Sequence, residues 1–236
     1  MLKYTVDRAL FEAVPTLCFG IVAATGITAP RDAERLRAFF DAACQENIER
    51  RALKIKEDPA VVPYREAMRA LGINPNRFPP SLEALLTRLV KGKGLPHISP
   101  LVDAVNAVSL TCDVPLGAHD AATLTDGTLS VRPARAGDTF VPFGSDTAEI
   151  PDTGEIVYVS GSAVRTRRFI WRQSECGKMT AATTRALFPI DGFVDTKDRI
   201  AAAQDLLIWW LTEEFGARVQ SGFVTAASPV WETHDL

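Results

Sequence analysis

The spacing of apolar residues changes near Pro115, and this change limits the folds that the chain can adopt. Before Pro115, apolar residues recur every three or four positions, which is the spacing of helices that bury one face. After it, short runs alternate between apolar and polar residues and are separated by glycine, proline, aspartate and serine, which is typical of antiparallel strands joined by turns. Helices and strands occupy mostly separate parts of the chain, so we expect an α+β fold.

Prolines and capping side chains mark where the predicted helices begin. We place helices at residues 32–53, 58–72, from 79, from 99, and 195–216. We place strands at residues 16–24, 128–132, 139–143, 155–160, 163–171 and 217–226. The chain shows no internal repeat and no linker, so we predict one compact domain over residues 1–236, with helices packed on a mostly antiparallel mixed sheet.

Composition bears on compartment and cofactors. No apolar run approaches the ~20 residues that span a bilayer, and the charged start, residues 1–8, does not resemble a secretory signal. We therefore predict a cytoplasmic protein without membrane contact. The four cysteines are scattered singly, which indicates reduced thiols and no structural zinc, and we predict no metal and no cofactor.

The usual catalytic motifs are incomplete. The glycine-lysine segments at 91–94 and 177–180 lack the spacing of a phosphate-binding loop. No serine lies in a G-x-S-x-G turn, which argues against an α/β-hydrolase nucleophile. Of the three histidines, His119 deserves most weight because it follows a predicted helix and precedes Asp120. It could act as a general base or orient a water, or it could be a turn residue bonded to the backbone.

Charge is segregated along the chain although the net charge is only −3. Residues 163–185 contain six bases and one acid, whereas residues 136–164 contain five acids and no base. This distribution can form a positive face that binds RNA, or a sheet surface crossed by salt bridges. Arginines that alternate with aromatic residues can hold phosphates and stack on bases, or can border an apolar core. The predicted RNA-binding residues are Arg165, Arg167, Arg168, Lys91 and Lys93.

Four segments occur in an order that is more specific than any one of them. They are PPSLEALLTRLVKG (79–92), LPHISPLVDAVNAVSL (95–110), PLGAHD (115–120) and RFIWRQS (168–174). Together they resemble the editing module of the phenylalanyl-tRNA synthetase β subunit, which its third and fourth B domains form, and in particular the form of this module found outside the synthetase. The resemblance covers about residues 64–216. Within the predicted domain, residues 58–216 carry the motifs, and residues 1–57 form an N-terminal strand and helix extension.

The resemblance implies a function. In the synthetase this module hydrolyses tyrosine wrongly attached to tRNA for phenylalanine, so the resemblance implies an α+β fold, tRNA or aminoacyl-tRNA as partner, and hydrolysis of aminoacyl-tRNA in the service of translation fidelity. It does not imply ligation, because the ATP-binding motifs of the synthetase are absent. The alternatives are a module that binds tRNA without hydrolysis, and a module that binds a small molecule such as an amino acid.

The resemblance also suggests which residues form the site. Bacterial synthetases carry a pocket histidine in a Met-His-Ala-Phe-Asp stretch, where this chain has Gly117, and His119 lies two positions later on the same side of an alternating strand. We expect His119 and Asn106 to be catalytic. The expected substrate-binding residues are Ser109, Gly117, Ala118, Arg172, Gln173 and Ser174. Thr180, Thr183 and Asp191 are weaker candidates for the far wall.

Overall fold

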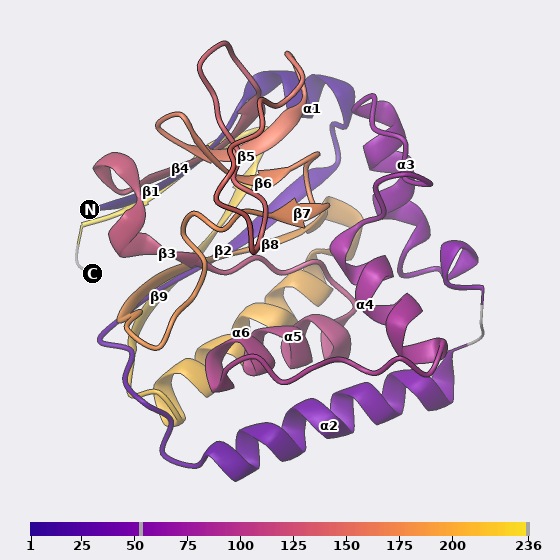
Figure 1. Cartoon of the computed structure of the whole chain (residues 1–236), viewed down its shortest axis with the longest axis vertical. Coiled ribbons are helices and arrows are strands. Elements are labelled where there is room, and N and C mark those ends of the chain that lie inside the picture. Colours follow the sequence, from indigo (N-terminus) through magenta and orange to yellow (C-terminus); the bar gives the residue numbers. More distant parts are fainter. Residues whose placement is uncertain (52–53, 235–236) are drawn as a thin grey trace.

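The computed structural model of the chain describes residues 1–51 and 54–234 and has the predicted α+β architecture, with two sheets where we expected one (Figure 1). The helices are α1 (Arg8–Ala13), α2 (Ala33–Arg50), α3 (Val62–Ala70), α4 (Ser81–Val90), α5 (Pro100–Cys112) and α6 (Lys197–Glu213). The strands are β1 (Leu2–Val6), β2 (Leu17–Thr25), β3 (His119–Asp120), β4 (Thr128–Pro133), β5 (Ile156–Ser160), β6 (Ala163–Arg167), β7 (Arg172–Gln173), β8 (Arg185–Phe193), β9 (Arg218–Thr225) and β10 (Val230–Thr233). None of the described helices is long and apolar enough to cross a membrane.

The sheets differ in size and in pairing. The larger has the order β10-β1-β4-β5-β6-β7, and the smaller has the order β3-β8-β2-β9. In the larger sheet β1 and β4 run parallel, while β1 and β10, β4 and β5, β5 and β6, and β6 and β7 run antiparallel. All pairs of the smaller sheet are antiparallel. The N-terminal strands therefore contribute to both sheets: β1 to the larger and β2 to the smaller.

The central strand β2 is buried on both faces, and its residues alternate between two cores. Phe19 and Ile21 pack in the core that also contains Tyr4 of β1 and Leu129 of β4. Cys18 and Val22, which point the other way, pack in the core that contains the inner face of α6. Because successive side chains of a strand point to opposite faces, a continuous apolar run such as β2 needs a cover on each side. The six-stranded sheet provides one cover and the helices provide the other.

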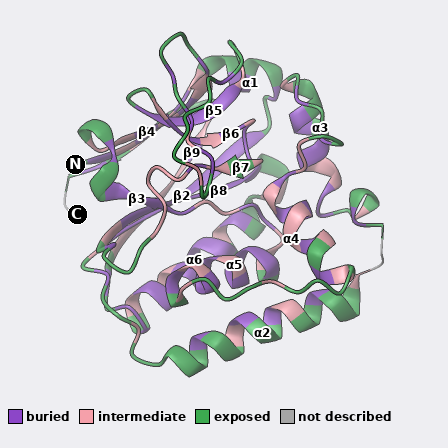
Figure 2. Cartoon of the chain, viewed as in Figure 1, coloured by how far each residue is buried: buried purple, intermediate pink, exposed green. Residues whose placement is uncertain are grey.

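Helices α5 and α6 lie on one side of the smaller sheet with α2 outside them, whereas α1 lies beside the larger sheet (Figure 1). Figure 2 shows buried residues along the strands and the inner faces of α5 and α6, whereas the outer face of α2 is exposed. Glycine lets α6 approach the sheet closely, because a Cβ at Gly20 would lie 2.4 Å from Ile200 Cγ2, and one at Gly192 would lie 2.7 Å from Ile200 Cδ1. Both glycines face Ile200, which is fully buried.

Most predicted elements are confirmed. The Ser99 side chain accepts a hydrogen bond from the Val102 amide at 3.3 Å and caps α5, as expected from Ser-Pro at that point. The final strand pairs with β2 as β9. The predicted helix over residues 32–53 is observed as α2, and its predicted end at residue 53 lies outside the described residues.

Two predicted strands are wrong in part or in whole. Residues 139–143 form only isolated bridges, such as that of Phe140 with Glu149. The strand expected over 163–171 ends at Arg167, because Arg168 and Phe169 have left-handed φ angles of 49° and 63° and turn the chain into β7. The strands β1, β8 and β10 were not predicted.

We expect Gly20→Ala to destabilise the fold by about 1–3 kcal/mol, because the added methyl group overlaps Ile200 in a packed core. Urea unfolding of Gly20→Ala, of Ile200→Ala and of the double variant measures the loss of stability. The double variant should lose less stability than the sum of the single losses, since Ile200→Ala removes the atom that the new methyl group meets. Additive losses would contradict the packing described.

Candidate functional site

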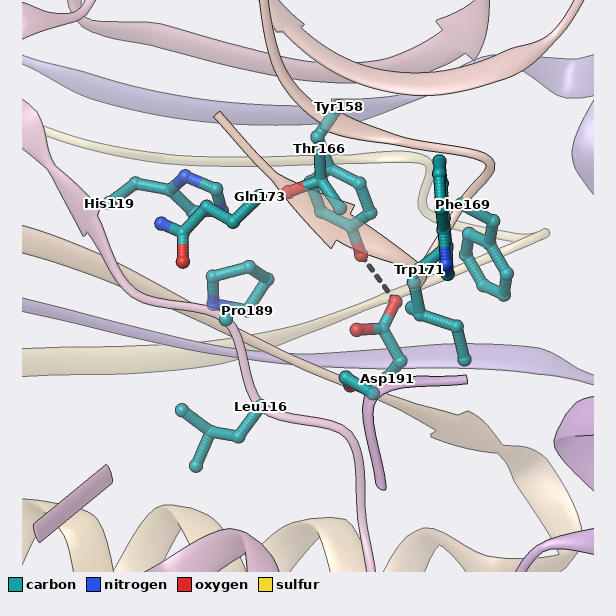
Figure 3. Close-up of a pocket in the computed structure, with 12 residues that line it drawn as sticks. Leu116, His119, Tyr158, Thr166, Phe169, Trp171, Gln173, Pro189 and Asp191 are labelled. Atoms are coloured by element: carbon teal, nitrogen blue, oxygen red, sulfur yellow. Dashed lines mark hydrogen bonds between the residues drawn. The ribbon is translucent and has the colours of Figure 1, made fainter. Parts of the chain in front are cut away.

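A cavity of about 80 Å³ lies between the two sheets, where β3 and β8 face β5 and β6 (Figure 3). Three aromatic side chains line it, together with five polar residues and four apolar or glycine residues. The aromatic residues are Tyr158, Phe169 and Trp171, and the polar residues are Ser81, His119, Thr166, Gln173 and Asp191. The remaining residues are Leu116, Gly117, Ile170 and Pro189.

The cavity opens where a proline interrupts the pairing of β8. The chain before β3 runs antiparallel to β8, and the Gly117 amide donates to the Pro189 carbonyl at 2.8 Å. Proline has no N–H to return this hydrogen bond. On the other side of this gap, His119 pairs with Leu187 in regular register. The break in the ladder therefore leaves Gly117, His119 and Pro189 beside the cavity.

His119 lies at the cavity as a neutral imidazole. The residue is 1% exposed, and burial, with a smaller contribution from the positive charge of Arg165, lowers its pKa to about 3. Its ring lies nearly parallel to the Tyr158 ring, with centroids 6.0 Å apart. Its Nδ1 atom has no hydrogen-bond partner among the described residues. Its Nε2 atom lies 3.2 Å from the point where a Cβ on Gly117 would stand, so glycine at 117 makes room for the ring.

Asp191 faces the same cavity from β8 and is 3% exposed. Burial raises its pKa to about 7, although a hydrogen bond from Tyr158 favours the charged form. The Tyr158 hydroxyl donates to Asp191 Oδ1 (Figure 3). The Tyr4 hydroxyl donates to the Tyr158 hydroxyl at 3.3 Å. Tyr64 donates to the Asp191 carbonyl at 3.1 Å. Within the described part of the chain, no Lys, Arg or His forms an ion pair with this carboxyl group.

The arginines predicted to bind RNA are largely buried. Arg165 is buried, and its guanidinium donates to the Thr123 hydroxyl at 3.0 Å. Arg167 is also buried, and its guanidinium lies 2.7 Å from Glu155 and from Glu149. These two arginines are not available to phosphates in this fold, because neighbouring groups hold their charged ends.

Arg168 does not continue strand β6, since it lies in the turn that follows this strand. It pairs with Asp152 at 2.9 Å and lies 3.9 Å from the centre of the Phe78 ring. Its acidic partner, like those of Arg167, comes from the acid-rich segment that precedes β6. The structure thus favours the salt-bridged interpretation of the segregated charge. Of the predicted RNA-binding residues, Lys91 and Lys93 are exposed, on the turn after α4.

Four of the predicted pocket residues line the cavity, namely Gly117, His119, Gln173 and the weaker candidate Asp191, and Ala118 lies next to it. The Ala118 carbonyl accepts a hydrogen bond from Gln173 Nε2 at 2.6 Å, which holds Gln173 in place. Arg172 is exposed between the lining residues Trp171 and Gln173.

The other predicted site residues have structural roles or lie elsewhere. Asn106 is half-buried on α5 and does not line the cavity. The Ser109 hydroxyl donates to the Val114 carbonyl at 2.6 Å, and the Ser174 hydroxyl donates to the Val141 carbonyl at 2.9 Å. Both hydroxyls therefore bond to backbone carbonyl groups and not to the cavity.

Asp120 does not orient His119, although the two are neighbours in sequence. Its carboxylate accepts hydrogen bonds from the Thr183 hydroxyl at 2.7 Å and from the Ala122 amide at 2.9 Å. No sequence pattern marked Tyr158, which reaches the cavity because its strand β5 lies opposite β8, and Asp191 was only a weaker candidate.

Comparison with known proteins agrees with this architecture. A sequence profile of the B3/4 domain family matches residues 63–206. The chain belongs to the B3/4 domain family. Among solved structures, its fold is similar to that of an N-terminal fragment of the phenylalanyl-tRNA synthetase β-subunit from Pyrococcus horikoshii, with a TM-score of 0.51 and 11% identity. The similarity covers 92% of this chain and 49% of that fragment, so this B3/4 protein spans about half of it. Curated protein sequences contain no match.

Arg167→Met should destabilise this B3/4 domain by about 3 kcal/mol, because it leaves the Glu155 side chain, 4% exposed, without its closest cation. Urea unfolding of Arg167→Met, Arg172→Met and the double variant Arg167→Met with Glu155→Gln tests this. The exposed Arg172→Met should change stability by less than about 0.5 kcal/mol, and the double variant should recover part of the loss. Equal stabilities of the two single variants would contradict the buried ion pair.

Asp191 and His119, two titratable residues of the cavity, should affect the pH dependence of stability in opposite directions. The pKa of Asp191 rises from about 3.9 in the unfolded chain to about 7 in the folded chain. The contribution of Asp191 to the free energy of unfolding is therefore fully present below about pH 4 and is lost as the pH rises through 7. The pKa of His119 falls from about 6.5 unfolded to about 3 folded. Its contribution is present above about pH 6.5 and is lost as the pH falls toward 3.

Because these dependences oppose each other between about pH 4 and 6.5, single variants should separate them. In Asp191→Asn the free energy of unfolding should rise with pH over this range, and in His119→Gln it should fall. Each slope should approach about 1.4 kcal/mol per pH unit, relative to the flatter wild-type profile. Urea unfolding at half-unit pH intervals measures the three profiles, and parallel profiles would refute the assigned protonation states.

Proposed function

We propose that this chain binds the aminoacyl end of an aminoacyl-tRNA in the cavity and hydrolyses the ester that joins the amino acid to ribose. The observation that carries the proposal is the convergence of a neutral imidazole and a buried carboxyl group on one cavity of a B3/4 fold. A shared fold does not by itself specify an activity. The size of the cavity and the chemistry of its side chains support the activity.

The size of the cavity suits an aminoacyl group. A cavity needs about 10–15 Å³ for each water that it holds, so this one has room for roughly five to eight water-sized groups. That is sufficient for an amino acid of modest size and its ester, whereas a nucleoside must remain outside. Arg172 is exposed between the lining residues Trp171 and Gln173, which supports a contact between its guanidinium and a phosphate of the attached RNA.

His119 can stabilise the charge that develops on the ester oxygen. A buried N–H without a partner is rarer than an unpaired acceptor, and Nδ1 has no partner, so the proton belongs on Nε2, toward Gly117 and the cavity. A neutral imidazole that donates from this nitrogen can polarise a carbonyl group, and a fixed donor of this kind contributes about 10²–10³ in rate. An aminoacyl ester is already activated, so a held water and such a donor suffice for hydrolysis.

A binding module without hydrolysis is the second candidate. It is favoured by one observation: Asp120, which could have oriented His119, is bonded to Thr183 and Ala122 instead. With no carboxylate to support it, His119 is a weak base, and the site could retain an aminoacyl-tRNA or a free amino acid without cleaving it. The two candidates share the ligand and differ in the chemistry.

A deacylation assay separates them. We expect the wild-type protein to accelerate ester loss from at least one member of a panel of correctly and wrongly charged tRNAs. His119→Gln should slow this by about 10²–10³. Gly117→Ala should slow it by about tenfold, because its methyl group would lie 3.2 Å from both His119 Nε2 and Pro189 Cγ and narrow the cavity. Thr111→Ala, an exposed change at the end of α5, is the matched control.

The outcomes are distinct. No acceleration, together with binding of charged tRNA that weakens as salt rises, would establish the binding module. Arg172→Glu should then weaken binding, whereas Arg37→Glu on the outer face of α2 should not. Absence of both hydrolysis and binding would refute the proposed function.

A further inference from the structure

Asp191 occupies a position where the sheet otherwise places apolar residues. Side chains of β8 alternate between the two cores, and Leu187 and Phe193, which share the face of Asp191, both belong to the core between the sheets. Burying a carboxyl group without a cation is costly, because its charged form loses its hydration. An ionised acid at this point weakens the fold unless a cation balances its charge.

The hydrogen bonds around Asp191 fix the carboxyl group without neutralising it. Among the described side chains, Tyr158 is the one that bonds to the carboxyl group, and Tyr4 in turn donates to Tyr158. Tyr64 bonds to the backbone carbonyl of Asp191 and so holds β8 at this position. None of these groups carries a positive charge. Among the residues that the structure describes, no cation therefore balances the ionised carboxylate.

The other walls of the cavity also suit a cation. Tyr158, Phe169 and Trp171 line it, and the faces of aromatic rings attract positive charge. His119 supplies no positive charge, because burial keeps it neutral. In Figure 3 the Tyr158 and Asp191 side chains point toward each other at one end of the cavity, while His119 and Gln173 lie at the other. The cavity thus has a charged end and a neutral hydrogen-bonding end.

We infer that Asp191 determines the specificity of this site by binding the α-ammonium group of an aminoacyl ester, with the aromatic side chains around it. The inference rests on the proposed function, since it assigns one end of that ligand to one end of the cavity. The ammonium group lies at Asp191, and the ester carbonyl lies toward His119. Tyr158 is a positioning residue, because it holds the carboxylate through a hydrogen bond. Acids that lack the amine, joined to ribose by the same ester, are rejected because they leave the carboxylate unpaired.

The pH dependence of binding follows from the groups that face Asp191. These are Tyr158 from β5, Tyr4 from β1, Tyr64 from α3 and His119 from β3. Burial raises the pKa of each of the three tyrosines, and His119 is neutral above about pH 3. Between pH 5.5 and 7.5, Asp191 is therefore the group among these that titrates. Binding of an ammonium group requires its ionised form, so affinity should rise with pH over this range.

Calorimetric titration with two matched pairs of probes tests the inference. The probes are alanyl- and phenylalanyl-adenosine joined by a 3′-amide, which cannot be hydrolysed, and the same compounds with hydrogen in place of the α-ammonium group. We expect the wild-type protein to bind an amine-bearing probe about ten- to a hundredfold more tightly than its deaminated partner at pH 7.5. The difference should shrink at pH 5.5. Asp191→Asn should abolish it, and Thr111→Ala should leave it unchanged.

Each outcome bears on a different claim. Equal affinity of the wild-type protein for a probe and its deaminated partner would overturn the inference and leave the proposed function standing. The inference would also be overturned if Asp191→Asn abolished ester hydrolysis but still bound amine-bearing probes more tightly than their deaminated partners. Asp191 would then act as a base. Failure of every probe to bind would overturn both claims. The wild-type comparison needs no variant, so poor folding of Asp191→Asn would not prevent the test.

Discussion

The pairing of β2 with β8 is the constraint on which the rest of the structure depends. The two strands pair without interruption from Leu17 opposite Phe193 to Thr25 opposite Arg185, and both are buried on two faces. Their alternating side chains form both cores, so neither the larger sheet nor the helices could pack without them. Because β8 also carries Pro189 and Asp191, this wall of the candidate site belongs to the buried sheet, whereas Gly117, Phe169 and Trp171 reach the cavity from turns and loops.

The same strand explains where prediction from sequence succeeds and where it fails. Helices with clear caps, such as α5 after Ser99, follow from local spacing alone. Local spacing did not predict strand β8, because Pro189 and Gly192 are residues that usually end a strand. In the structure each has a specific reason: Pro189 lies at the break in the ladder beside the cavity, and Gly192 lets Ile200 of α6 approach. Such reasons depend on neighbours that are distant in sequence.

The charged residues illustrate a second limit. The sequence showed that acids precede the bases, but it could not decide between a surface for RNA and internal ion pairs. The internal ion pairs form because the chain turns at Arg168 and because a loop brings Glu149 and Glu155 close to Arg167. Likewise, the resemblance located Gly117 and His119, whereas Tyr158 and Asp191 meet only because two sheets pack face to face.

The arrangement of Gly117 and His119 suggests how the site can keep a histidine at a different position. The resemblance to the synthetase module implies a pocket histidine at position 117, where this chain has glycine, and the Nε2 atom of His119 lies 3.2 Å from the point where a Cβ on Gly117 would stand. The imidazole of His119 is buried, so it is neutral and suited to donating a hydrogen bond. The other end of the cavity depends on Tyr4, which lies outside the matched residues 63–206. The polar groups of this cavity therefore require the N-terminal strand as well as the B3/4 segment.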